Sequence, residues 1–324
     1  MNGARPSGLM SVFDPRPLRS LLFVPAHREG WPEKAVAAGA DGVLLDVQDA
    51  VPEGEKHTAR NVAAAAIDRL AHSGRSVLVR VGAPGSPELT ADLDAVVRPG
   101  LDGVVVPMVR SPAEVVEVDT ELTARETARG MAAGSIALTP LIETAEAARF
   151  AYEVASASAR VAYLGGGTGP DGDIARAIGF VWSAAGDETL FLRSWVLLNA
   201  RAAGVPWPIS GLWPLVDDLD GLRRFATQTR GLGYTGMMAI HPSHVAVINE
   251  VFTPGAAEIA RWQATIAAVE AASSAGLGAV RLAAGGPGDA GRGAAMVDAA
   301  HARTARDGLA LAARLGLAVS PPPV

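Results

Sequence analysis

Residues 135–173 read SIALTPLIETAEAARFAYEVASASARVAYLGGGTGPDGD and have the pattern of one strand–helix–strand unit. A β-branched and apolar run ends at Glu143, an alanine-rich helical pattern follows, and the next apolar run leads through a glycine-rich loop to Asp173. In a chain that repeats such units, the strands run parallel and the residues just beyond them meet at one mouth. Two carboxylates there could hold a hard cation together with a small oxo acid. The pattern therefore favours an enzyme.

The same alternation repeats along most of the chain. Eight short runs rich in Val, Leu and Ile are separated by alanine-rich stretches whose apolar residues recur at helical spacing. Most runs are continuously apolar, as expected for parallel strands that are covered on both faces. Eight units favour a (β/α)8 TIM barrel over an open doubly wound sheet, with the chemistry at the carboxyl ends of the strands. The runs span residues 20–25, 41–47, 76–82, 102–109, 135–142, 160–166, 208–215 and 235–242.

Two regions lie outside the predicted barrel. Residues 1–17 are expected to form a flexible N-terminal arm, and residues 18–255 the catalytic barrel. Residues 256–324 are too many for one closing helix, so they predict a C-terminal helical extension. The glycine-rich stretch at 280–297 is expected to be a flexible loop that acts as a lid.

Composition limits the class of protein. The chain has 324 residues, 49% apolar and 19% charged, which is enough for a large core. Its net charge of −6, with scattered basic residues, argues against partners such as nucleic acid or an anionic membrane. The lack of cysteine excludes disulfides, thiolate chemistry and Cys-based zinc sites. Neither a signal-like segment nor a long uninterrupted apolar segment is found, so we expect a cytoplasmic protein.

Charged residues at the ends of the apolar runs are candidate site residues. Arg80 lies inside the run 76–82, where a charge is costly without a partner. Its planar fork suits a carboxylate or a developing oxyanion, with a structural ion pair as the alternative. Glu143 is a predicted metal ligand, although it could instead be an acid at a helix N-terminus. Asp173 is the second predicted ligand, and Asp171 is its rival in the same PDGD sequence.

Two loops add further candidates. Asp46, Gln48 and Asp49 lie at the end of the second run, in LLDVQDAV, and Asp49 could be a helix N-cap or part of the site. The GGGTG sequence after the sixth run lacks the Lys-Ser/Thr ending of a P-loop. We therefore interpret Gly166 and Gly167 as positions where the backbone closely approaches a ligand or metal.

Several longer sequence segments resemble those of a known family. They are IHPSHVAVINEVFTP, which is the most specific, and RSLLFVP, EKAVAAGADGVLLDVQDAV, VLVRVG, DGVVVPMV and PLIETAEA. From about Arg19 to Leu315 the chain resembles the citrate lyase beta subunits and malyl-CoA lyases of the HpcH/HpaI aldolase superfamily. The resemblance implies a (β/α)8 barrel, often a homotrimer, that uses Mg²⁺ or Mn²⁺. It also implies cleavage or formation of a 3-hydroxyacyl-CoA, of the malyl, citramalyl or citryl type, with a 2-oxo acid and an acyl-CoA on the other side of the reaction.

The resemblance implies roles for matching residues. Glu143 and Asp173 would bind the metal, and Arg80 would bind the oxo-acid end and the developing oxyanion. Arg19 and Arg28, around the first strand, would contact a carboxylate or the CoA phosphates.

The C-terminal segment and the second loop would complete the site. Asp298, in AAMVDAAH, would reach a neighbouring subunit's site as an acid–base group. Asp49 would position water or the metal shell, and Gln48 would contact the substrate.

The chain departs from the family pattern at several points. Gln48 replaces a usual Glu, Gly82 a usual Asn and Met108 a usual Lys, and the lid is altered around Arg292 and Ala294. These changes leave the metal pair and Arg80 intact. They keep open a CoA-independent 2-oxo acid aldolase, a malyl-CoA-type thioesterase and a non-catalytic auxiliary subunit as alternatives.

Overall fold

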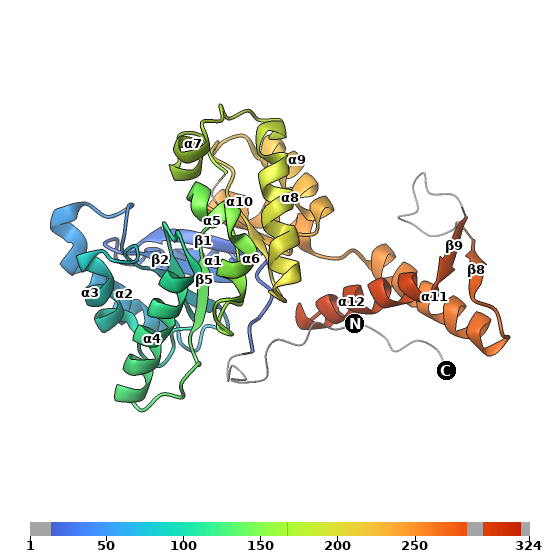
Figure 1. The fold of residues 1–324 in the computed structure, drawn as a ribbon, viewed down its shortest axis with the longest axis horizontal. Helices are drawn as coiled ribbons and strands as arrows, with labels where there is room; N and C mark the ends of the chain where they lie inside the picture. Colours follow the sequence, from blue (N-terminus) through green and yellow to red (C-terminus); the bar gives the residue numbers. More distant parts are fainter. Residues whose placement is uncertain (1–13, 167, 284–293, 319–324) are drawn as a thin grey trace. The chain divides into compact units, whose positions relative to one another are not determined.

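The computed structural model describes residues 14–166, 168–283 and 294–318 (Figure 1). The chain divides into two compact units, Met1–Phe252 and Thr253–Val324. Gly167, most of the predicted lid including Arg292, and most of the predicted N-terminal arm lie outside the described residues. In the described part of the chain, every helix is too short or too polar to cross a lipid bilayer.

The first unit is an α/β fold built on a parallel sheet. Strand β1 (Ser20–Pro25) pairs with β2 (Gly42–Asp46) on one side and with β7 (Gly236–Ala239) on the other. The sheet has the order β5-β4-β3-β2-β1-β7-β6, and its strands coincide with seven of the predicted runs. The remaining strands are β3 (Ser76–Arg80), β4 (Gly103–Val106), β5 (Ala137–Pro140) and β6 (Ile209–Ser210).

The sixth predicted run, residues 160–166, does not form a full strand. It makes two isolated parallel bridges to the β5 segment, Leu138 with Val161 and Leu141 with Gly165. Its other side bonds to β6, because Ile209 N donates to Leu164 O at 3.1 Å. A Cβ on Gly165 would lie 2.6 Å from the Ile209 carbonyl oxygen, so only glycine fits this approach. Glycine also weakens strand pairing. Within the described residues the sheet has seven strands where eight were predicted.

Helices alternate with these strands, as the sequence predicts (Figure 1). Their N-termini carry the expected signals: α4 begins after Ser111, which forms a capping box with Glu114, and has Pro at its first position. The helices are α1 (Trp31–Ala37), α2 (Lys56–Leu70), α3 (Pro87–Val96), α4 (Pro112–Ala128), α5 (Ala145–Arg149), α6 (Ala151–Ser156), α7 (Asp173–Ile178), α8 (Asp187–Ala202), α9 (Leu219–Leu232) and α10 (Pro242–Phe252), with a short 3₁₀ turn η1 (Glu53–Glu55) before α2.

Two charged residues lie on the same face and at the same end of the sheet. Leu44 of β2 and Leu78 of β3 belong to an apolar cluster on one face of the sheet, with Leu21, Val105, Ala137, Ile209 and Met238. Asp46 and Arg80 follow them by two residues, so they face the same side. Both are the last residues of their strands. They therefore lie at the carboxyl edge, above this cluster.

The second unit is an antiparallel pair of helices with a small β-ladder. Helices α11 (Ala256–Ser274) and α12 (Ala299–Arg314) pack through Trp262, whose ring would lie 2.6 Å from a Cβ on Gly308. Strands β8 (Ala279–Leu282) and β9 (Ala295–Asp298) pair antiparallel. The expectation of a flexible stretch over all of 280–297 was therefore wrong at both of its ends, which the ladder fixes; Ala294 directly precedes β9.

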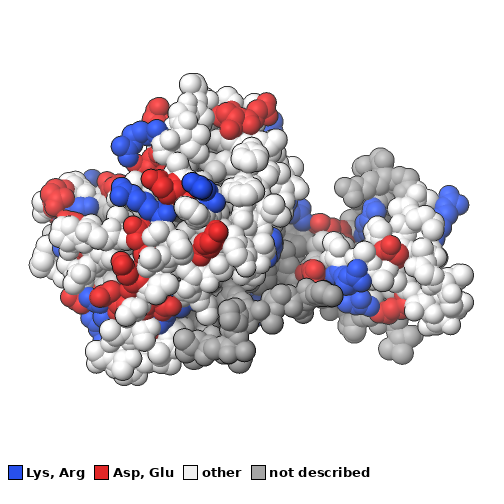
Figure 2. All heavy atoms as spheres, in the orientation of Figure 1, with Lys and Arg blue, Asp and Glu red and all other residues white. Residues whose placement is uncertain are grey.

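Charges of both signs are mixed on the surface. On the face that Figure 2 shows, Lys and Arg side chains are interspersed with Asp and Glu. This face has no broad basic area of the kind that a nucleic-acid backbone requires.

Candidate active site

Arg80 is held by a two-pronged ion pair with Asp46. Its Nε donates to Asp46 Oδ1 at 3.0 Å and its Nη2 donates to Oδ2 at 2.6 Å. The two residues are partners in the parallel ladder, and the guanidinium lies 5.2 Å from the centre of the Phe23 ring. Burial lowers the pKa of Arg80, but the hydrogen bonds and charge of Asp46 outweigh it and raise the pKa above its ordinary value. Arg80 is thus a fixed cation at the carboxyl edge.

The loop after β2 adds a second carboxylate to this cation. Asp49 Oδ2 accepts from Arg80 Nη1 at 3.3 Å, and Asp49 Oδ1 accepts from Gln48 Nε2 at 2.5 Å. The loop is secured by Lys56, whose Nζ donates to the Gln48 carbonyl oxygen at 2.5 Å. Partial burial raises the pKa of Asp49, Arg80 lowers it, and the charges of Asp46 and Asp173 raise it further, with a net rise. The Asp49 side chain is 60% exposed, so solvent screens these effects.

Glu143 lies just beyond β5 and has a strongly shifted ionisation. Its pKa rises to about 7, mainly through burial, with smaller rises from the charges of Asp173 and Asp49; Arg80 and one hydrogen bond act in the opposite direction. The hydrogen bond comes from Met108 N, which donates to Glu143 Oε2 at 3.3 Å. Met108 has a left-handed φ of 55°, an uncommon backbone conformation for a residue other than glycine. Such strain often occurs at functional sites.

Asp173 is the first residue of α7, and its charge acts on both Glu143 and Asp49. Its side chain is 40% exposed and forms an ion pair of 3.1 Å with Arg176. Asp171, its rival in the sequence, is exposed and has a left-handed φ of 55°. Because its charge raises the pKa of both Glu143 and Asp49, Asp173 belongs to the same group of carboxylates.

The residues at this edge fit a divalent cation. The raised pKa of Glu143 has like-charged neighbours among its causes, and a bound cation would relieve their repulsion. In the described residues, no three Asp, Glu or His side chains are arranged as a metal site. Mg²⁺ commonly uses one or two protein carboxylates and completes its shell with water and substrate oxygens. Glu143 and Asp173 are the residues that would hold it.

The two other predicted arginines lie at different ends of the sheet. Arg19 precedes β1, and its Nε and Nη2 each donate to an oxygen of Asp41 at 2.7 Å. Because Asp41 precedes β2, this pair lies at the amino edge, and the structure does not bring Arg19 together with Arg80. Arg28 follows β1 at the carboxyl edge, where it is exposed and lies 5.9 Å from the centre of the Trp31 ring.

Asp298 lies in the second unit and caps a helix. It is the N-cap of α12, where its Oδ1 accepts from Ala300 N at 2.9 Å and contacts His301 Nδ1 at 2.8 Å. The hydrogen bonds from His301 and Ala300 lower the pKa of Asp298. In this conformation Asp298 is a weaker base than an ordinary aspartate.

Two glycines explain local features of the site. A Cβ on Gly82 would lie 2.7 Å from Ser86 Oγ and 2.9 Å from Leu89 N, so the loop after Arg80 has no room for an Asn. A Cβ on Gly166 would lie 2.9 Å from the carbonyl oxygen of Ile142, the residue before Glu143. The predicted close approach at Gly166 is therefore an approach to protein backbone.

Sequence reasoning assigned no role to three contributors. Asp46 is the main partner of Arg80, Lys56 secures the loop, and Met108 acts through its backbone N–H. Asp46 had a detectable signal, because a charge that ends an apolar run needs a partner. Lys56 and Met108 had none, since both contacts involve main-chain atoms whose positions depend on the fold.

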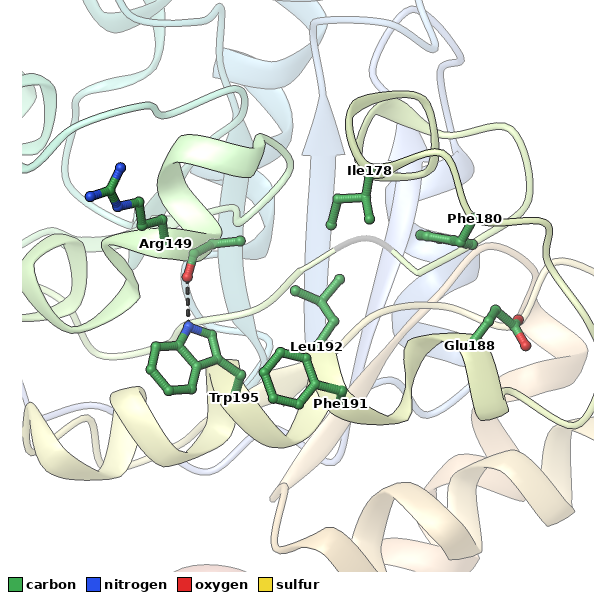
Figure 3. A pocket seen from close by; sticks show the side chains of 8 residues that line it. Arg149, Ile178, Phe180, Glu188, Phe191, Leu192 and Trp195 are labelled. Carbon is green, nitrogen blue, oxygen red and sulfur yellow. Dashed lines mark hydrogen bonds between the residues drawn. The ribbon is translucent and has the colours of Figure 1, made fainter.

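A separate pocket lies between α5, α7 and α8. It has a volume of about 380 Å³ and contains none of the predicted site residues. Figure 3 shows Ile178 and Phe180 facing Leu192 and Phe191 of α8, and the Trp195 indole donating to the Ala148 carbonyl oxygen, at 2.7 Å. The lining residues are Ala148, Arg149, Ile178, Phe180, Glu188, Phe191, Leu192 and Trp195.

Residues 19–242 match the family described as HpcH/HpaI aldolase/citrate lyase. The chain belongs to this family. The beta subunit of citrate lyase from Escherichia coli (strain K12) is 31% identical over 267 residues, covering 82% of this chain and 87% of that protein. The L-malyl-CoA/beta-methylmalyl-CoA lyase of Cereibacter sphaeroides (strain ATCC 17025 / ATH 2.4.3) is 31% identical over 284 residues, covering 82% and 88%.

A solved structure extends this comparison. The protein CitE from Mycobacterium tuberculosis, in complex with magnesium, acetoacetate and coenzyme A, has a TM-score of 0.67 and 28% identity. The match covers 92% of this chain and 98% of that chain. The family predicted from the sequence phrases is confirmed.

Proposed function

We propose that this protein is a magnesium-dependent carbon–carbon lyase that cleaves or forms a 3-hydroxyacyl-CoA, with a 2-oxo acid and an acyl-CoA as the other reactants. The predicted enzyme class, a metal-dependent carbon–carbon lyase, is confirmed by the relatives. The observation that carries the proposal is Arg80, which Asp46 and Asp49 fix at the carboxyl edge and whose charge acts on Glu143. Coenzyme A and acetoacetate in the Mycobacterium tuberculosis structure support the substrate class.

Arg80 has donors left for a ligand. A guanidinium has five N–H groups, and Asp46 and Asp49 engage three of those of Arg80. No further acceptor for Arg80 is found within the described residues. The remaining N–H groups can bind the carboxylate of an oxo acid or the oxyanion that develops on bond cleavage. Because Asp46 is 0% exposed and pairs with two nitrogens of Arg80, the fork is oriented before the ligand arrives.

Glu143 and Asp173 would hold Mg²⁺ or Mn²⁺. The bound ion supplies Lewis-acid polarisation of the oxo-acid oxygens and neutralises charge on the ligand. The raised pKa of Glu143 means that its carboxylate is protonated in part at neutral pH in the metal-free protein. Glu143 therefore has to lose that proton when it becomes a ligand.

Two aspartates are assigned different parts in the reaction. Asp298, presented by a neighbouring copy of the chain, moves a proton at the acyl end, and Asp49 positions water or the metal shell beside Arg80. The contact of Asp49 with Arg80 supports its part. For Asp298, release from its cap on α12 would restore the basicity that the hydrogen bonds of His301 and Ala300 remove. Arg28, exposed at the same edge as Arg80, is assigned to the CoA phosphates.

The fold is proposed to be a closed (β/α)8 barrel. Residues 161–165 take the place of the eighth strand, with parallel bridges to the β5 segment on one side and a bond to Ile209 of β6 on the other. An experimental structure in which this segment contacts only one of the two strands would contradict closure.

The protein is proposed to form homotrimers through the surface around α7 and α8. Exposed apolar side chains gather there: Phe191 is 77% exposed, Leu198 63% and Ile178 50%. Patches of this kind mark protein–protein contacts. Phe191→Asp should reduce the mass measured by light scattering to that of a monomer. Val116→Asp, which changes an exposed residue of α4, is the matched control and should leave the mass unchanged.

The decisive experiment measures binding of pyruvate, glyoxylate and oxaloacetate by calorimetry, with and without Mg²⁺. Wild-type protein should bind at least one acid only with Mg²⁺, and Glu143→Ala should abolish this binding. Glu117→Ala, a change of an exposed acid on α4, is the control and should bind as the wild type does. Binding that is independent of both Mg²⁺ and Glu143 would contradict the proposal.

Turnover separates the lyase from a subunit that only binds. With an acyl-CoA present, the acid that binds should be consumed and the 3-hydroxyacyl-CoA should be formed, as followed by chromatography. An acid that binds with Mg²⁺ but is never converted would favour the non-catalytic subunit.

A further inference from the structure

Gln48 forms hydrogen bonds with three charged residues near Arg80: Asp46, Asp49 and Lys56. Its main-chain N donates to Asp46 Oδ1 at 2.9 Å, and its carbonyl oxygen accepts from Lys56 Nζ at 2.5 Å. Its side-chain Nε2 donates to Asp49 Oδ1 at 2.5 Å, and the other oxygen of Asp49 accepts from Arg80. The main-chain contacts do not depend on the type of side chain. The amide contact to Asp49 does.

The orientation of the Gln48 amide follows from its neighbours. Turning the amide over would place Oε1 against Asp49 Oδ1, so two acceptors would meet at hydrogen-bond distance. In the observed orientation Oε1 is buried and has no hydrogen-bond partner among the described residues. A glutamate here would put a charged oxygen in that buried place and a second one against Asp49. It would reduce this double penalty only by taking a proton.

We infer that Gln48 is a positioning residue: its amide N–H holds Asp49 as an ionised acceptor for Arg80, and thereby leaves the remaining Arg80 N–H groups directed at the anionic ligand. The inference rests on the proposed function. It also gives a physical reason for Gln48 at a position where the family usually has a glutamate. The Gln48 amide is always the donor and Asp49 always the acceptor, whereas a glutamate and Asp49 would have to share a proton. Gln48 thus acts through Asp49, and the direct contact with substrate that the sequence suggested is not needed.

The groups that face Asp49 set the expected pH dependence. They are Arg80 on β3, Asp46 at the end of β2, Asp173 on α7 and Lys56 on α2. Gln48→Glu leaves all of these groups in place. The ratio of variant to wild-type affinity at each pH therefore reports the effect of the residue at position 48 alone. At pH 8.5 the new carboxylate is ionised and repels Asp49, and at pH 6.0 it is protonated to a larger extent and can donate to Asp49 as the amide does.

The test measures pyruvate binding by calorimetry with saturating Mg²⁺ at both pH values. Gln48→Glu should weaken binding at least about tenfold at pH 8.5 and less than about threefold at pH 6.0. Gln48→Met, which removes the donor without adding charge, should weaken binding to a similar extent at both pH values. Gln263→Glu on α11, the same chemical change in the other unit, is the control and should leave the affinity unchanged.

A reciprocal exchange tests whether the effect passes through Asp49. In Gln48→Glu/Asp49→Asn, the introduced asparagine can donate from its Nδ2 to the new carboxylate while its Oδ1 accepts from Arg80. The double variant should therefore bind pyruvate at pH 8.5 more tightly than Gln48→Glu alone, a non-additive result expected only for directly coupled residues. Thermal unfolding of each variant, with a midpoint near that of the wild type, shows that the protein is folded. If Gln48→Met does not fold, the exchange alone decides.

The outcomes separate the two proposals. Wild-type binding that depends on Mg²⁺ and Glu143, with no loss in Gln48→Glu at pH 8.5 or no recovery in the exchange, overturns the role of Gln48 and leaves the proposed function intact. Absence of any acid binding by the wild type overturns both.

Discussion

Glu143→Gln should stabilise the metal-free protein at alkaline pH and change it little at acidic pH. Folding raises the pKa of Glu143 from 4.5 to about 7, so the folded state keeps a proton that the unfolded state has already lost between these values. The free energy of unfolding therefore falls as pH rises through this window. The pKa difference corresponds to a loss of about 3 kcal/mol at most, complete above pH 7. Glutamine has the shape of the protonated acid and does not titrate.

The assay is urea denaturation of the wild type and Glu143→Gln, with EDTA, at pH 5.0 and pH 8.5. The midpoints should nearly coincide at pH 5.0, and the variant should be more stable by up to about 3 kcal/mol at pH 8.5. Added Mg²⁺ should stabilise the wild type at pH 8.5 and not the variant, because only the wild type has the carboxylate ligand. Glu117→Gln, at an exposed position of α4, should change stability by less than about 0.5 kcal/mol at both pH values. A stability difference between Glu143→Gln and wild type that is the same at both pH values would falsify the reasoning.

Substitutions at three further positions test the site and its supports. Arg80→Lys should weaken Mg²⁺-dependent pyruvate binding at least about tenfold, measured by calorimetry, because an ammonium cannot reproduce the fork held by Asp46. Arg80→Met should destabilise the protein in thermal unfolding by about 3 kcal/mol, since Asp46 would be left buried without a charged partner. Gly82→Asn, which restores the usual family residue, should lower the midpoint of thermal unfolding by an amount equivalent to about 1–3 kcal/mol, because its Cβ would overlap Ser86 Oγ. Asp298→Ala should lower the helical circular dichroism signal of α12 on heating, whereas Asp298→Asn, which can still cap, should not.

The hydrophobic pattern predicted the parallel strands well because it reflects a local requirement. A strand covered on both faces needs a continuous apolar run, and runs such as 41–47 and 76–82 contain β2 and β3. The run 160–166 meets the same requirement but does not form a full strand. Its Gly165 serves the approach to Ile209, a contact between segments far apart in sequence that no local pattern encodes.

The sequence by itself determined the family, the repeating strand–helix order and the presence of Arg80, Glu143 and Asp173 at strand or helix ends, because residue type and spacing carry this information. Only the tertiary structure decided which charges meet. It paired Arg80 with Asp46 through the ladder register and directed the Met108 N–H at Glu143. It also placed Arg19 at the opposite edge with Asp41. The physical reason is that an ion pair or a pKa shift depends on distance and burial in three dimensions, which the order of residues along the chain does not specify.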